Sequence, residues 1–250
     1  AAEAAIDQAT DLNTMNQAKQ DASTLDRAMG TLKQAITDGE ATHGTVAYDE
    51  ADPDKKSTLD NAIKNGQAVT DATNGSNADL TTVKDLSQAI ENAQTGLNGN
   101  SNLSKAKEQA DQHIEQMTNL SDDQKKAAKD KINSAKTSSD VQQAESDADN
   151  LGKLNQAISA ANSAKSTPNY NEADPDKKKA LDDALTEAEN AKTSNDPSAV
   201  KQATKDLQAA QSGLNGDSNL SKAKEQADQH IEQMTNLSDD QKKAAKDKIN

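Results

Sequence analysis

The chain has 250 residues, a formal net charge of −14 and no Cys, Trp or Phe. Only 32% of its residues are apolar, against roughly 45–50% in ordinary globular domains. The acidic balance disfavours nucleic acids and anionic membranes as partners, because phosphate groups are bound by basic surfaces. No apolar run is long enough to insert into a bilayer. Ala is abundant and apolar residues recur at helical spacing, which favours several small helical bundles over a disordered chain or one large core.

The first predicted elements are the end of a helix at 1–9 and a long helix with Asn13 as its N-cap. Apolar residues then follow at spacings of three and four: Met15, Ala18, Ala22, Leu25, Met29, Leu32 and Ile36. We expect this helix to end before Gly39–Thr45. Its later counterpart starts at a capping box of Ser139 and Gln142. Since only Gly152 weakens Ser139–Lys165, we expect one continuous helix there that belongs to two bundles and couples them stiffly.

A second motif follows each long helix, as YDEADPDKK at Tyr48–Lys56 and YNEADPDKK at Tyr170–Lys178. Within it, Asp52-Pro53 and Asp174-Pro175 predict helix starts, with the Asp side chain accepting from free backbone N–H groups and Pro in the first helical position. Two more helices with apolar inner faces then complete each unit. Those faces are Leu59, Ile63, Val69 and Val83, Leu86, Ile90, Ala93 in the first unit, and Leu181, Leu185, Ala188 and Val200, Ala203, Leu207, Ala210 in the second. Polar turns are predicted at 73–77 and 193–197, and GLNG closes each unit.

The next stretch is written twice. Asn102–Asn133 recurs letter for letter as Asn219–Asn250, and repetition at a fixed period is typical of tandem modules. It predicts two short helices, the first with the stripe Leu103, Ala106, Ala110, Ile114 and Met117, and the second opened by a capping box at Ser121–Gln124.

Both ends of the chain are related to this repeated stretch. Three N-terminal apolar positions match three positions after it: Ile6, Ala9 and Met15 correspond to Ile132, Ala135 and Val141. The second copy lacks the third helix that residues 138–150 supply to the first. We therefore expect an unburied stripe at Ile231, Met234 and Ile249, which either frays or pairs with a neighbouring molecule.

The residues capable of chemistry form no recognisable catalytic or metal site. His43, His113 and His230 have no second His or Cys at ligand spacing, and Asp52-x-Asp54 and Asp174-x-Asp176 lack the Gly and closing Glu of a calcium loop. Tyr48 and Tyr170 are interpreted as packing anchors, with ligand contact as the alternative. No nucleophile motif or phosphate-binding loop is present. We therefore predict that the chain is not an enzyme and has no cofactor, and we assign no residue to catalysis, metal binding or ligand contact.

Specific motifs carry a resemblance to known families. Leu103–Leu151, with its LxxAKxxA opening and INSAKTSSDV junction, resembles the GA module of bacterial surface proteins. The units with YxEADPDKK and a GLNG ending resemble FIVAR modules, and their alternation is similar to the giant extracellular-matrix-binding surface proteins of staphylococci. The resemblance implies a GA-like end at 1–19, FIVAR-like modules at 20–98 and 150–215, a GA-like module at 99–149 and a truncated one at 216–250. The expected fold is all-α: an elongated tandem array of three-helix bundles that share long connecting helices.

This resemblance also implies a function. Such proteins are secreted, associate with the cell envelope and attach bacteria to host matrix, with fibronectin as the implied ligand. We expect a monomeric segment that binds fibronectin through many weak, repeated contacts. The alternatives are a passive spacer or cell-envelope element, and albumin capture. GA modules that bind albumin use aromatic residues on their second helix, where this chain has Ala127, Ala128 and Lys129, so albumin is the less favoured ligand.

Overall fold

The computed structural model describes residues 2–71, 77–194 and 196–249, and this part of the chain is helical without any strand. The expected all-α fold is confirmed. The helices are α1 (Ala2–Asp7), α2 (Leu12–Ala41), α3 (Val46–Asp49), α4 (Pro53–Thr70), α5 (Leu80–Thr95), α6 (Gly99–Gln116), α7 (Asp122–Ser134), α8 (Ser138–Ala164), α9 (Pro168–Asn171), α10 (Pro175–Thr193), α11 (Pro197–Ser212), α12 (Gly216–Glu232) and α13 (Asp239–Lys246).

The chain divides into two compact units. Unit 1 holds residues 1–111 with 132–142, and unit 2 holds residues 112–131 with 143–250. The predicted turn at 73–77 lies outside the described residues except for Asn77, and Asn195 of the turn at 193–197 lies outside them too.

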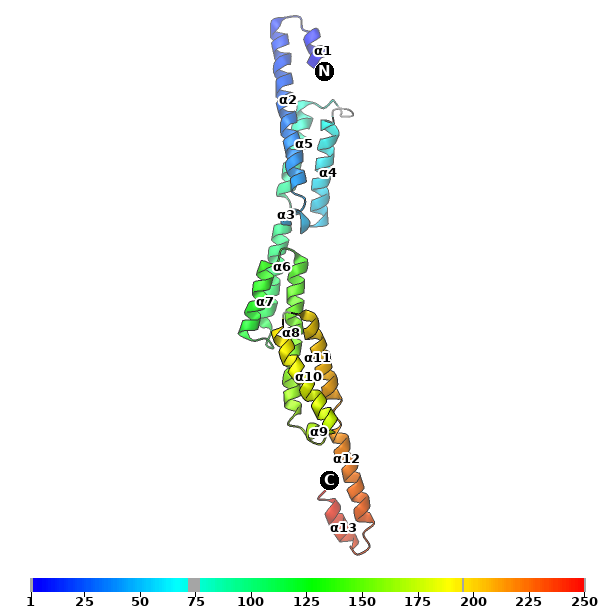
Figure 1. Ribbon diagram of the computed structural model, residues 1–250. Helices are drawn as coiled ribbons and strands as arrows, with labels where there is room; N and C mark the ends of the chain where they lie inside the picture. The colour runs from blue at the N-terminus through cyan, green and yellow to red at the C-terminus, as the bar shows by residue number, and fades with distance from the viewer. Residues whose placement is uncertain (1, 72–76, 195, 250) are drawn as a thin grey trace. The chain divides into compact units, whose positions relative to one another are not determined.

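In unit 1, helices α2, α4 and α5 pack as a three-helix bundle (Figure 1). Seven of its ten buried core residues are predicted apolar positions at helical spacing, whereas Ala28, Ala35 and Ala62 were not predicted. The core residues are Ala28, Leu32, Ala35, Ile36, Leu59, Ala62, Ile63, Val83, Ile90 and Ala93. Leu86 and Val69, which were also predicted on the inner faces, are half-buried at the edge of this core.

Our expectation that the first long helix ends before Gly39 is wrong, because α2 continues to Ala41. Gly39 is buried in the bundle, and a Cβ atom there would lie 3.0 Å from Ile63 and 3.1 Å from Ile90. Glycine is normally unfavourable inside a helix. At this position it permits a close approach of α4 and α5, so tertiary packing overrides the local signal.

Two predicted helix starts are also corrected. The N-cap of α2 is Asp11 rather than Asn13, and its carboxylate accepts from the backbone N–H of Thr14 at 2.8 Å. The counterpart before α8 is a reciprocal pair: the Asp140 N–H donates to Thr137 Oγ1 at 3.0 Å and the Thr137 N–H donates to Asp140 Oδ2 at 3.2 Å. Because Thr137 and Asp140 satisfy these free donors, the helix begins one residue before Ser139.

The capping box at Ser121 and Gln124 is confirmed. The Gln124 N–H donates to Ser121 Oγ, and the Ser121 N–H donates to Gln124 Oε1 at 3.0 Å. The second copy repeats both bonds at Ser238 and Gln241. The identical sequences therefore form the same helix start at α7 and α13, although α13 ends earlier, at Lys246.

Helix α8 is continuous from Ser138 to Ala164, as the sequence predicts. In unit 2 its second half packs with α10 and α11 into a further three-helix bundle. The buried residues of this bundle are Leu154, Ala157, Ile158, Ala161, Ala173, Leu181, Ala184, Ala188, Ala191, Val200, Ala203, Leu207 and Leu214. Many are Ala, so the helices can approach closely with few large side chains.

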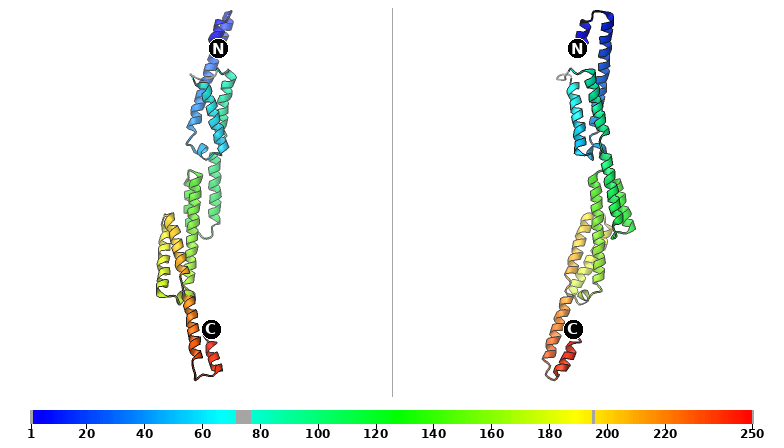
Figure 2. Two further views of the ribbon diagram at one scale, coloured as in Figure 1. Left: turned by 90° about the vertical axis from the view of Figure 1, so that its right-hand side faces the viewer. Right: turned by 180° about the vertical axis from the view of Figure 1, so that it is seen from behind.

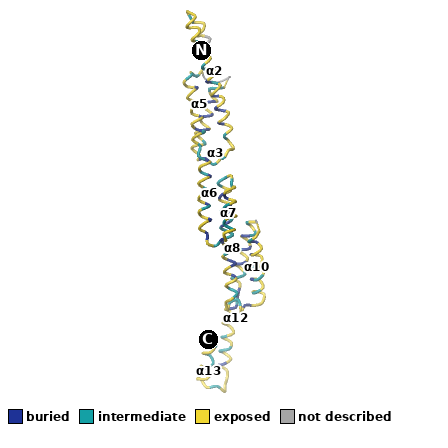
Figure 3. Tube along the Cα trace, turned by 90° about the vertical axis from the view of Figure 1, so that its left-hand side faces the viewer, coloured by how far each residue is buried: buried dark blue, intermediate teal, exposed yellow. Residues whose placement is uncertain are grey.

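The ends of the chain carry helices that are much less buried. Helix α1 lies beside α2 in unit 1, and α12 lies beside α13 in unit 2 (Figure 2). The described side chains of α1 are exposed, and those of α13 are exposed or half-buried (Figure 3). The predicted stripe is partly uncovered: Met234 is 36% exposed, whereas Ile231 retains only 8%.

Candidate functional site: module joints and surface grooves

The first joint, which consists of Glu50, Asp52, Asn98, Gly99 and Asn102, ties the start of α4 to the start of α6. Asn98 Nδ2 donates to Asp52 Oδ2 at 2.7 Å, and the Asp52 N–H donates back to Asn98 Oδ1 at 3.0 Å. Asn102 Nδ2 donates both to Asp52 Oδ1 and to the Glu50 carbonyl, each at 3.0 Å. The Asp52 carboxylate is therefore held by the amide groups of Asn98, which directly precedes α6, and of Asn102 in the first turn of α6.

The second joint repeats this arrangement in unit 2 with Glu172, Asp174, Asn215, Gly216 and Asn219. The Asn215–Asp174 pair has the same two bonds at 2.7 and 3.0 Å. Asn219 Nδ2 donates to Asp174 Oδ1 at 2.9 Å and to the Glu172 carbonyl at 3.0 Å. The EADP and GLNG motifs thus form a single hydrogen-bonded joint, although in the sequence they read as a helix start and a separate helix end.

This arrangement corrects the predicted role of Asp52 and Asp174. Both precede a Pro at the helix start as expected, but neither side chain makes a capping hydrogen bond. Side-chain amide groups at the starts of α6 and α12 donate to the carboxylates instead. A signal for this pairing was present, since the Asn of each Gly-Leu-Asn-Gly motif is followed four residues later by a second Asn in both copies.

Gly99 and Gly216 make the close approach at the joints possible. A Cβ atom on Gly99 would lie 2.2 Å from the Val46 carbonyl oxygen, and one on Gly216 would lie 2.3 Å from the Asn169 carbonyl oxygen. Both obstacles are backbone atoms, which cannot rotate away as a side chain can. In unit 1 the joint also reaches α8, because the Ser138 N–H donates to Glu50 Oε2 at 3.0 Å.

Hydrogen bonds from Asn98 and then Asn102 lower the pKa of Asp52, and Asn215 and Asn219 lower the pKa of Asp174 in the same way. A folded-state pKa below the unfolded value of about 3.9 gives a stabilisation that is complete above that value. It is lost as pH falls through the folded pKa. We therefore expect the Asp52 amide proton to exchange more slowly than its local sequence predicts above about pH 4, and to lose this protection only below about pH 4, measured by NMR between about pH 5 and 2.

Asp52→Asn should remove this pH dependence, because an amide cannot accept from both Asn98 and Asn102 as a carboxylate does. Asp54→Asn is the matched control, since it changes the charge of the same helix start and leaves the bonds to Asn98 and Asn102 in place. If the amide protection of Asp52→Asn still fell below about pH 4, the assignment of this pH dependence to the Asp52 carboxylate would be contradicted.

The two tyrosines lie in the short helices α3 and α9 and use their hydroxyl groups internally. Tyr48 Oη donates to Asp60 at 2.9 Å, and this bond is the main cause of its raised pKa. Tyr170 Oη donates to Asp182 at 3.0 Å, and burial is the main cause of its raised pKa. Both rings are half-buried, which fits the interpretation as packing anchors.

The histidines pair with carboxylates. His43 Nε2 lies 2.9 Å from Asp60 Oδ1, and His113 Nδ1 lies 2.5 Å from Glu145 Oε1. Among the described residues, no group of three His, Cys, Asp or Glu side chains could hold a metal ion. Asp54 and Asp176 lie in the first turns of α4 and α10.

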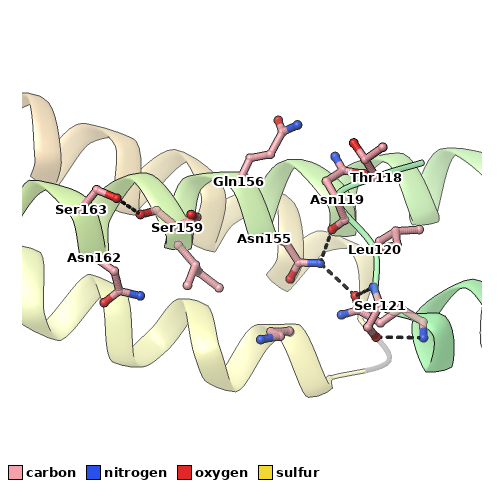
Figure 4. A pocket seen from close by; sticks show the side chains of 12 residues that line it. Thr118, Asn119, Leu120, Ser121, Asn155, Gln156, Ser159, Asn162 and Ser163 are labelled. Atoms are coloured by element: carbon pink, nitrogen blue, oxygen red, sulfur yellow. Dashed lines mark hydrogen bonds between the residues drawn. The ribbon is translucent and has the colours of Figure 1, made fainter. Parts of the chain in front are cut away.

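A shallow polar groove lies in unit 2 where the loop between α6 and α7 meets α8 (Figure 4). Its volume is about 950 Å³, and its lining is mainly amide and hydroxyl side chains, including Asn119, Gln156, Ser159 and Asn162. Asn155 Nδ2 fixes one end by donating to the Asn119 carbonyl at 2.7 Å and to Gln124 Oε1 at 2.9 Å. The α6–α7 loop is thus held against α8.

A smaller groove of about 260 Å³ bears on the albumin alternative. Ala127 and Ala128 of α7 line it together with Leu151 of α8 and Pro197 and Val200 of α11. The surface of α7, the second helix of the GA module, thus carries small side chains, as the sequence indicates. It also borders the bundle that contains α11. Neither feature provides the large anchor that usually dominates an interface.

The described part of the chain consists of three-helix units that follow one another along the sequence and are connected by repeated polar joints. This architecture is that of an all-α modular protein. The FIVAR domain model matches residues 28–98 and 150–215, and the GA module model matches residues 100–157 and 217–250. The chain belongs to the FIVAR family, and its FIVAR modules alternate with GA modules. The two models overlap within α8, the helix that both module types use.

The chain is similar over nearly its whole length to relatives of known name. The chain is 34% identical over 98% of its length to extracellular matrix-binding protein EbhA of Staphylococcus aureus strain Newman, and 36% identical over 98% to extracellular matrix-binding protein ebh of strain NCTC 8325 / PS 47. It spans only 7% and 2% of these proteins. A crystal structure of EbhA residues 756–1003 from S. aureus matches 88% of this chain and 92% of its own, with a TM-score of 0.60 and 28% identity.

None of the described helices is long and apolar enough to cross a membrane.

Proposed function

We propose that this chain is a segment of a bacterial surface adhesin that binds host extracellular matrix, with fibronectin as the ligand, through many weak and repeated contacts. The observation that carries the proposal is the alternation of FIVAR and GA modules over nearly the whole chain, together with its similarity over 98% of its length to relatives named extracellular matrix-binding proteins. The same relatives support an extracellular location at the cell surface.

The repeated surfaces supply the mechanism. Each module type occurs twice, so related polar surfaces are repeated along one chain. Once one module contacts an immobilised ligand, the others face it at high effective concentration, and avidity rises without tighter individual contacts. The joints at Asp52 and Asp174 support this mechanism because they fix each FIVAR-like bundle to the helix that follows it.

Two alternatives start from the same structure. A passive spacer or cell-envelope element is supported by the continuous α8 and by the joints. These features would suit a spacer as well as the presentation of modules to a ligand. Albumin capture is supported only by the presence of GA modules. The small side chains of Ala127 and Ala128, next to Pro197 of the following bundle, argue against it.

The test is binding to surface-coated fibronectin, with coated albumin in parallel. The 250-residue chain is compared free in solution and as a biotinylated form clustered four at a time on streptavidin. The proposal predicts weak binding of the single chain to fibronectin, at least about a hundredfold stronger apparent binding of the clustered form, and none to albumin. Equal binding per chain in both forms would remove the avidity mechanism. No fibronectin binding by either would leave the spacer, and binding to albumin alone would favour albumin capture.

A further inference from the structure

Each joint contains an Asn-Gly pair, because its two residues meet separate demands of the structure. Asn98 supplies a side-chain amide that holds Asp52, with Nδ2 donating to Asp52 Oδ2 at 2.7 Å. Gly99 must follow it, because a Cβ atom there would lie only 2.2 Å from a backbone carbonyl oxygen. Asn215 and Gly216 meet the same two demands in the second joint. The packing of the joints therefore requires this dipeptide at both places.

An asparagine that precedes glycine is open to attack by its own backbone. The nitrogen of the next residue can attack the side-chain Cγ, and glycine has no Cβ to hinder the rotation that this needs. The N–Cγ bond forms, the Cγ–Nδ2 bond breaks, and the backbone amide proton passes through solvent to the leaving nitrogen, which departs as ammonia. Water then opens the cyclic imide to an aspartate or its β-linked isomer. Asparagine is thermolabile through reactions of this kind.

The closed joint holds the asparagine away from the geometry of this reaction. Asn215 has a ψ angle of 14°, whereas ring closure needs the Gly216 nitrogen to eclipse the Cβ atom of Asn215, a large backbone rotation away. The side chain is also fixed, because Asn215 Oδ1 accepts from the Asp174 N–H at 3.0 Å and Nδ2 donates to Asp174 Oδ2 at 2.7 Å. Since Gly216 is buried, the rotation requires α12 to leave its place beside α9.

Helical hydrogen bonding does not provide this protection. Gly99 and Gly216 are the first residues of α6 and α12, and the first N–H groups of a helix have no intrahelical acceptor. The pair Asn65-Gly66 is different, because it lies inside α4, where the helix occupies the Gly66 N–H. Asn98 and Asn215 thus depend on the joints, and Asn65 depends on its own helix.

We propose that Asn98 and Asn215 are deamidation sites that the closed joints protect, and that their modification opens a joint irreversibly. In the product, a second carboxylate faces that of Asp52 or Asp174. A carboxylate cannot donate a hydrogen bond, so repulsion between like charges replaces the donation from Nδ2. The Asp174 N–H can still donate to the new carboxylate, but only by holding both carboxylates at the 2.7 Å spacing of the lost bond. The start of α6 or α12 is then released from the preceding bundle.

Incubation of the full chain at mildly alkaline pH, with mass spectrometry of its peptides, tests the proposal. A deamidated peptide gains the mass difference between a hydroxyl and an amino group. In the folded chain, Asn98 and Asn215 should react at least about tenfold more slowly than in urea, where the joints are open. Asp174→Ala should raise the rate at Asn215 toward its value in urea and leave the rates at Asn98 and Asn65 unchanged.

Asp176→Ala is the matched control, because Asp176 lies in the first turn of the same helix and makes none of the bonds of the joint. It should deamidate as the unchanged chain does. Asn215→Asp carries the product from the start, and NMR should show fast exchange of the Asp174 amide proton at neutral pH. Circular dichroism should show equal helix content in all four proteins.

Two results would overturn the protection by the joints: equal rates at Asn215 in the folded chain and in urea, or an unchanged rate at Asn215 in Asp174→Ala. Slow exchange of the Asp174 amide proton in Asn215→Asp would overturn the opening of the joint by its product.

Discussion

Ile114→Ala is expected to lower the free energy of unfolding by about 4 kcal/mol, and the same substitution at the corresponding position, Ile231→Ala, by about half as much. Ile114 is fully buried in a module that has all three helices, whereas Ile231 is 8% exposed between α12 and α13. Truncating Ile removes the transfer energy of the lost carbons and leaves a cavity whose size depends on how well the site can collapse. The open α12–α13 pair can collapse further, so its cavity term is smaller.

The comparison is unusually well controlled, because the flanking sequence is identical for at least ten residues on both sides of each site. Urea unfolding followed by circular dichroism should show the larger loss for Ile114→Ala. A modular chain need not unfold in one step, so amide exchange of each copy should be followed by NMR, where the different surroundings separate the signals. Equal losses at the two positions would mean that the third helix does not provide the burial of Ile114.

The helices themselves were predictable because their signals are local. Apolar spacing and capping residues placed α8 to within one residue at each end, and the Ser121–Gln124 box formed as expected in both copies. The error at Asn13 has a local cause as well. Asp11 lies two residues before Asn13, and its carboxylate reaches the Thr14 N–H and caps the helix.

The joints could not be predicted in the same way. Asp52 lies 46 residues from Asn98, and a local analysis of Asp before Pro gives the carboxylate to the nearest backbone N–H groups. The fold brings two side-chain amides to it instead. Gly39 is a similar case. Locally a glycine predicts a helix end, but inside α2 it is required because Ile63 and Ile90 lie too close for a Cβ atom. Long-range packing decided both cases.

Gly216→Ala is expected to open the second joint and to destabilise it by about 3 kcal/mol, at the upper end of ordinary overpacking. The added Cβ would lie 2.3 Å from the Asn169 carbonyl oxygen and 2.7 Å from the Pro168 carbonyl oxygen. Since neither atom can rotate away, α12 must shift away from α9. That shift would draw Asn215 away from Asp174, and the Asp174 N–H would lose its acceptor. NMR amide exchange at Asp174 should therefore become fast.

Gly213→Ala provides the matched control three residues earlier. Gly213 has an α-helical backbone (φ −80°, ψ −5°), and a Cβ there would approach nothing closer than 3.3 Å. Its effect should be small, and the Asp174 amide should stay protected. Gly99→Ala should reproduce the Gly216 result in unit 1, with fast exchange at Asp52, because the Val46 carbonyl oxygen would lie only 2.2 Å from the new atom. Slow exchange at Asp174 in Gly216→Ala and at Asp52 in Gly99→Ala would show that the joints do not depend on this close approach. The proposed presentation of modules to an immobilised ligand would then lose the support that the joints give it.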